Sequence, residues 1–211
     1  MLPPTTATAG EDTEVMNAHG SGRIIPLRRE GIALNGVFGT ALFVFVEVML
    51  FAGFISAFAI AKASAMPGMW PPPGQPRLPI ASTAVNTVAL LLSGVALYLA
   101  HRAYQKRGPR AAQTPLVIAI ALGMFFVGFQ GAEWLALIRQ GLTVTSSQLG
   151  SYFYLIIGCH AVHAVAALIA LFACWRTLRA NRLRASLFGG AQVFWYFVVL
   201  MWPVLYILVY L

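Results

Sequence analysis

The sequence predicts an all-α membrane protein, a bundle of five transmembrane helices. Of its 211 residues 59% are hydrophobic and only 9% are charged, whereas a soluble domain carries about 25% charged residues. Five apolar segments each reach the roughly 20 residues that a membrane span requires. No strand pattern or soluble domain separates these segments, so the chain reads as a polytopic membrane protein.

The five expected helices cover residues 34–61, 83–104, 114–138, 148–177 and 189–211. The polar stretch before them is rich in Thr, Pro and Gly and lacks the apolar centre of a secretory signal. We therefore expect two parts, a flexible polar tail over residues 1–33 and a five-helix transmembrane domain over residues 34–211.

The first apolar segment contains one carboxylate, Glu47, about a dozen residues from either end. At 1.5 Å per residue it lies roughly 18 Å deep, near the middle of the bilayer. The related penalty for Asp at a helix centre is roughly 2.5 to 3.5 kcal/mol. We therefore expect Glu47 to face protein, water or a partner subunit, because lipid tails could not solvate it.

The connector over residues 62–82 contains Trp70 followed by three prolines, Pro71, Pro72 and Pro73. Proline removes a backbone donor and restricts the residue before it, so this segment is not expected to be helical. Trp70 is expected to anchor the connector at the membrane interface. The segment serves either as a rigid connector or as a docking surface for a neighbouring subunit.

The second and third segments carry polar side chains within the membrane. Asn86 and Thr87 lie early in the second segment, and Gln130 and Glu133 lie three residues apart in the third. Residues three apart share one helix face, and polar side chains in a membrane interior bond across helices. We interpret these four residues as a structural polar seam.

The fourth segment carries His160 and His163, three residues apart, and we expect His160 to lie at the depth of Glu47. Neutral histidine can bind a metal or haem, but the first, third and fifth segments contain no facing histidine. The two cysteines, Cys159 and Cys174, lie roughly 22 Å apart on one helix and cannot pair. We predict no catalytic residue, no metal site and no redox cofactor in this chain; an accessory subunit and a small transporter both remain possible at this level.

The charges predict the orientation. The chain has 14 Lys and Arg against 6 Asp and Glu, and eleven of those cations fall in the tail, the second-to-third link or the fourth-to-fifth link. Because cytoplasmic loops are enriched in Lys and Arg, the N-terminus is expected inside and the C-terminus outside. No basic patch with interleaved aromatic residues accompanies these charges, which excludes nucleic acid as a partner.

Short stretches of the chain match a known protein family in its order, at residues 43–54, 70–72, 85–94, 130–134, 150–153, 158–163 and 195–202. Over about residues 36–211 the sequence resembles subunit III of the haem–copper oxidases, best known from cytochrome c oxidase. Members of that family carry no haem or copper and pack against subunit I, which does.

The resemblance implies several partners and a site. Its main expected partner is subunit I, with subunit II and other subunits of the complex nearby, and phospholipid held in a cleft between helices. It assigns lipid- or proton-related roles to Glu47, His160 and His163, and an anchoring role to Trp70. The chain would then stabilise subunit I and support proton uptake.

The sequence departs from longer relatives in two ways. They have two further N-terminal helices, so five spans favour a bacterial short form in the inner cell membrane. Relatives also often read Trp-His-Phe-Val-Asp in the last helix, where this chain has Tyr196 in place of His and Val199 in place of Asp. Any mechanism of those relatives that uses the His and Asp side chains is therefore not expected for this chain.

The predicted function is the non-catalytic subunit III of a bacterial terminal oxidase, which reduces O₂ to water in aerobic respiration and pumps protons. Cytochrome c is the favoured electron donor. The alternatives within the fold are subunit III of a quinol oxidase and an accessory subunit of a nitric oxide reductase. A small membrane transporter is the alternative from another class, disfavoured by the scarcity of charge at the membrane midplane.

Overall fold

The computed structural model describes residues 29–66, 70, 76 and 78–210. In this part of the chain the helices are α1 (Arg29–Ala63), α2 (Ile80–Arg107), α3 (Pro109–Arg139), α4 (Gln148–Arg179) and α5 (Ala185–Leu205), with a closing π-helical turn η1 (Tyr206–Tyr210). All five α-helices are long and apolar enough to cross a membrane. The prediction of an all-α chain with five spans is confirmed.

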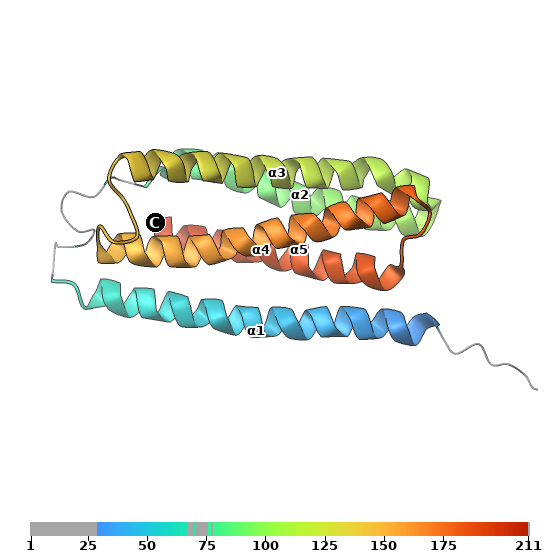
Figure 1. Cartoon of the computed structure of the whole chain (residues 1–211), viewed down its shortest axis with the longest axis horizontal. Coiled ribbons are helices and arrows are strands. Elements are labelled where there is room, and N and C mark those ends of the chain that lie inside the picture. The colour runs from blue at the N-terminus through green and yellow to red at the C-terminus, as the bar shows by residue number, and fades with distance from the viewer. Residues whose placement is uncertain (1–28, 67–69, 71–75, 77, 211) are drawn as a thin grey trace, which may run out of the picture.

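The helices lie side by side and the chain passes back and forth along the long axis (Figure 1). α4 and α5 occupy the middle, α1 covers one side of them, and the α2–α3 hairpin covers the other. α1 packs mainly on α5 and is the least buried helix, with Phe38, Phe45 and Met49 on its outer face. In a membrane, that apolar face suits lipid or a neighbouring subunit.

Most predicted helices are too short at their ends. α1 begins at Arg29 instead of residue 34, α2 spans three more residues at each end than predicted, and α5 begins at Ala185 instead of residue 189. The start of α4 at Gln148 agrees with the prediction, because Ser147 caps it by accepting the Gly150 amide at 3.0 Å. The proline-rich residues 67–69 and 71–75 lie outside the described residues.

The predicted loop between the second and third helices is wrong, since only Gly108 separates α2 from α3. Gly108 has φ of +86°, a left-handed conformation that glycine adopts without steric cost. Pro109 opens α3, where its missing amide hydrogen is harmless. Pro115 lies inside α3, where membrane helices tolerate proline.

Two fully buried tryptophans of α5 connect the centre of the bundle to α2. Trp195 donates from Nε1 to Oγ of Ser93 at 3.1 Å, and Trp202 donates to Oγ1 of Thr87 at 2.8 Å. Gly94 of α2 leaves room for Val199, because a Cβ there would lie 3.1 Å from the valine Cγ1. The valine that replaces the Asp of relatives is therefore a packing residue in this fold.

The bond from Trp202 to Thr87 can be tested with a double-mutant cycle. We expect Trp202→Phe to lower the free energy of unfolding by about 1 kcal/mol, because an interhelical hydrogen bond is lost in a dry environment. Thr87→Val should cost a similar amount, and the double variant less than the sum. Thermal unfolding of the purified chain in detergent measures these values; strict additivity would contradict the bond.

Candidate functional site

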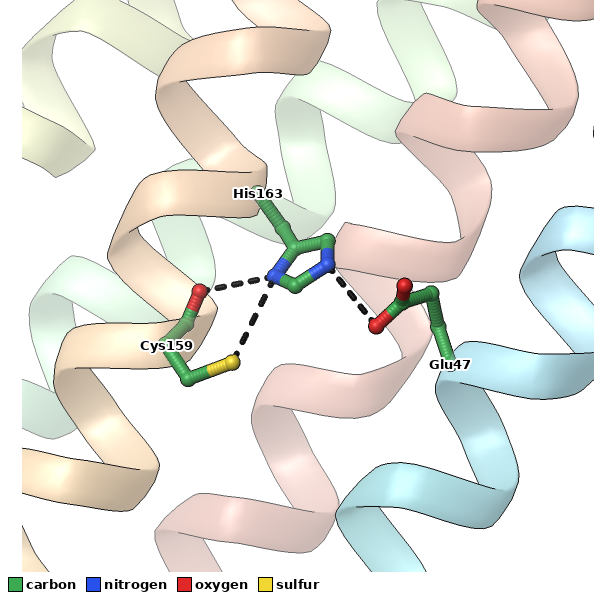
Figure 2. A network of polar contacts seen from close by, with 3 residues as sticks. All are labelled: Glu47, Cys159 and His163. Atoms are coloured by element: carbon green, nitrogen blue, oxygen red, sulfur yellow. Dashed lines mark hydrogen bonds and ion pairs between the residues drawn. The ribbon is translucent and has the colours of Figure 1, made fainter.

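Glu47 of α1 faces His163 of α4 at the junction of α1, α4 and α5. Oε2 of Glu47 lies 3.0 Å from Nε2 of His163 (Figure 2), and the two side chains are only 13% and 12% exposed. The sequence singled out His160 as the companion of Glu47 at its depth. The structure brings His163 to the carboxylate instead.

The other ring nitrogen of His163 identifies where a proton must lie. Nδ1 is 2.7 Å from the backbone oxygen of Cys159, which can only accept, so Nδ1 carries hydrogen (Figure 2). Nε2 then meets Oε2 of Glu47, and two bare lone pairs at that distance would repel. A hydrogen on Nε2 as well, facing an ionised Glu47, would make the contact an ion pair without net charge, although Oε2 is not aligned as a hydrogen-bond acceptor in the structure.

Aromatic rings surround this pair. Phe43 and Phe51 of α1 and Phe194 and Phe197 of α5 have ring centroids between 5.6 and 6.5 Å from that of His163. Such rings exclude water and lower the local dielectric, which strengthens the attraction between the two partners. In the same apolar surroundings, removal of one partner leaves the other polar group unpaired, which lowers the stability of the fold.

His160 belongs to a different environment from His163. It is 1% exposed, and its ring lies 5.1 Å from that of Trp202, with Phe126 and Phe51 at its other sides. Neither ring nitrogen has a hydrogen-bond partner among the described residues. The two histidines lie only three residues apart in the sequence, yet their side chains contact different parts of the bundle.

The four residues of the expected polar seam all make interhelical contacts. Asn86 donates to the Phe126 carbonyl at 3.1 Å, and Thr87 accepts from Trp202. Gln130 donates to the Tyr210 hydroxyl at 3.1 Å, and Glu133 accepts from both Thr83, at 3.0 Å, and Ser82. These bonds join α3 to α2 and to η1, and α2 to α5.

Sequence reasoning missed some of the partners. Ser93 donates to the Ala119 carbonyl at 2.8 Å while accepting from Trp195, and a serine in the middle of an apolar segment was a usable signal. His101 lies 3.0 Å from the Gln192 amide across the bundle. The role of Tyr210 could not be recognised from the sequence, because a tyrosine near the end of a membrane helix is typical of an interfacial anchor.

Trp70 lies half-buried with its ring 5.7 Å from that of Phe58, near the C-terminal end of α1. Its assignment as a lipid or subunit anchor stays a prediction. Among the described residues no group of three His, Cys, Asp or Glu is arranged to hold a metal ion.

An apolar groove of about 600 Å³ runs between α1 and α5, on the outside of the bundle. Its walls are lined by Val44, Val48, Ala52, Ile55, Val193, Tyr196, Phe197, Leu200, Met201 and Val204. Phe197 separates this groove from the Glu47–His163 pair, since its ring contacts both the groove and the imidazole. The groove therefore suits an apolar chain of lipid size next to the pair.

Comparison with known proteins assigns the fold to a family. Residues 19–211 match the family described as cytochrome c oxidase subunit III. The chain belongs to this family. It is thus a multi-pass membrane subunit of a respiratory oxidase complex, with the five membrane helices that the sequence indicated.

Curated relatives of this subunit III chain include cytochrome c oxidase subunit 3 of Hippopotamus amphibius, Aepyceros melampus and Litocranius walleri. Each is 32% identical over 180 residues, which make up 82% of this chain and 68% of the relative. The identity therefore extends over most of the bundle and is not confined to one motif.

Proposed function

We propose that this chain is the non-catalytic subunit III of a bacterial cytochrome c oxidase, in the five-helix short form, within the inner cell membrane. It stabilises subunit I, holds phospholipid and supports proton supply while the complex reduces O₂ to water. The observation that carries this proposal is the contact between Glu47 and His163, two nearly buried side chains 3.0 Å apart, beside an apolar groove.

The geometry supports two roles, lipid binding and proton holding, and assigns them to different groups of side chains. The groove between α1 and α5 offers apolar walls for an acyl chain. The pair can hold one proton between its two side chains, because Nε2 and Oε2 lie 3.0 Å apart. His160 contributes to a separate polar region, and Trp70 anchors the connector after α1.

The distribution of charge supports a cytoplasmic N-terminus. The α2–α3 and α4–α5 links lie at the same end of the bundle (Figure 1), and the basic residues Lys106, Arg107, Arg179 and Arg182 belong to that end. The positive-inside rule assigns such an end to the cytoplasm. The N-terminal end of α1, at Arg29, then lies on the cytoplasmic side.

Subunit I is the expected main partner, with subunit II and the remaining subunits completing the complex. The names of the curated relatives favour cytochrome c over quinol as the electron donor of the complex. Purification of the tagged chain from its native membrane is expected to recover a haem–copper partner that oxidises cytochrome c. Recovery of a complex that oxidises only quinol would overturn the donor, and recovery without any haem protein would overturn the proposal.

Glu47→Gln in the assembled oxidase tests the role of the pair. Gln keeps the side-chain size but cannot release a proton, so we expect haem reduction at the wild-type initial rate and a faster loss of activity during sustained turnover. Glu133→Gln, at a carboxylate that clamps α2 to α3, is the matched control and should retain the wild-type lifetime. Immediate failure of haem reduction in Glu47→Gln would contradict an accessory role.

A further inference from the structure

A second polar region lies between α3, α4 and α5, around a cavity of about 140 Å³. Gln130 and Trp134 line it from α3, His160 from α4, and Trp202 from α5. Gly131 and Ala161 also line it, on the α3–α4 side where the bundle surface begins. The Glu47–His163 pair is not among the residues that line this cavity.

Four buried polar atoms of these lining residues lack a hydrogen-bond partner in the described part of the chain. They are both ring nitrogens of His160, Oε1 of Gln130 and Nε1 of Trp134. His160 is 1% exposed and Gln130 is 4% exposed, so bulk solvent does not serve them. More than about 90% of buried polar groups in proteins are paired, and a concentration of exceptions at one cavity indicates a missing partner.

The four atoms define what that partner must be. Trp134 offers an N–H donor, and Gln130 offers an acceptor, because its amide nitrogen already donates to Tyr210. A neutral imidazole offers one donor and one acceptor. The occupant must therefore donate twice and accept twice. An acyl chain can do neither and would leave all four atoms unpaired.

We propose that this cavity binds a cluster of water molecules held by His160, Gln130 and Trp134. Water donates and accepts in equal measure, and a water occupies about 30 Å³ in the liquid, so the volume admits about four molecules. The cavity walls are mostly apolar, so the case for water rests on the four unpaired polar atoms of the lining residues, which an apolar occupant would leave without a partner. The cluster extends the bond between Gln130 and Tyr210 into a hydrogen-bonded chain that reaches His160.

Radiolytic labelling of the assembled oxidase tests the proposal, because hydroxyl radicals generated from bound water oxidise only the side chains beside it. α5 supplies a matched pair of tryptophans, both fully buried. Trp202 lines the cavity, and Trp195 does not. We expect oxidation of Trp202 several-fold faster than that of Trp195. Equal protection of both would show a dry or lipid-filled cavity and overturn the proposal.

His160→Leu removes two of the four polar atoms at similar side-chain volume. Labelling of Trp202 is expected to fall toward that of Trp195 in this variant, and undiminished labelling would overturn the assignment of His160 as a water ligand. If the variant does not fold, the comparison of Trp202 with Trp195 in the wild-type complex still decides whether the cavity is wet. The outcome is independent of the role proposed for Glu47.

Discussion

Gly123→Val is expected to lower the free energy of unfolding by about 3 kcal/mol, the upper part of the usual range for overpacking a core. A Cβ at Gly123 would lie 2.6 Å from Cη2 of Trp195 and 2.8 Å from Cδ2 of Leu168. The leucine methyl can rotate away, but the Trp195 ring is fully buried and bonded to Ser93. The new side chain therefore forces α3 away from α5.

Gly128→Val is the matched control on the same helix, since a Cβ there meets nothing within 4 Å. It should change stability by less than about 1 kcal/mol, the scale of helix propensity. Thermal unfolding of both purified variants in detergent gives the comparison. Trp195→Phe removes the clashing part of the ring and should partly rescue Gly123→Val. Equal melting temperatures for the two glycine variants would contradict the close approach of α3 and α5.

His163→Leu is expected to cost about 3 to 5 kcal/mol, the range measured when one partner of a buried pair is removed. The variant leaves Glu47 without its partner and puts an apolar side chain where the imidazole lay among Phe43, Phe51 and Phe197. The double variant with Glu47→Leu should recover much of that loss, because an apolar pair of similar volume has no unpaired group to desolvate.

His101→Leu serves as the control for the loss of a histidine. His101 is paired with the neutral amide of Gln192 at 3.0 Å, so its replacement should cost about 1 kcal/mol. Denaturant or thermal unfolding of His163→Leu, Glu47→Leu, the double variant and His101→Leu in detergent yields the coupling between Glu47 and His163. A coupling near zero would contradict the pairing of these two side chains.

Much of the fold followed from hydropathy, because a span must satisfy all of its backbone hydrogen bonds internally and therefore must be helical. The positions of the helix ends could not be predicted from hydropathy. Lys106, Arg107 and Arg110 were assigned to a loop because charge is unfavourable within a span, yet they extend α2 and α3 past the apolar region. Helices continue beyond the bilayer wherever capping and the linking geometry permit, and Gly108 permits a link of one residue.

The candidate site was predicted in its members but not in its connections. Glu47, His163 and the polar residues of α2 and α3 were identified because unpaired polar groups are costly in a membrane. Their partners depend on how five helices rotate about their axes. Ser93 and Tyr210 were missed for that reason, and the cavity beside His160 involves three helices whose facing sides no sequence period fixes.

The sequence by itself determined five helices of membrane-spanning length and a carboxylate in the middle of the first, since length and position along the axis are properties of a helix alone. Only the tertiary structure decided which histidine Glu47 meets. His160 and His163 differ in depth by roughly 4.5 Å and in direction by roughly 60° about the helix axis. That rotation turns His163 toward α1 and His160 toward Trp202 of α5, and it separates the Glu47–His163 pair from the cavity beside His160.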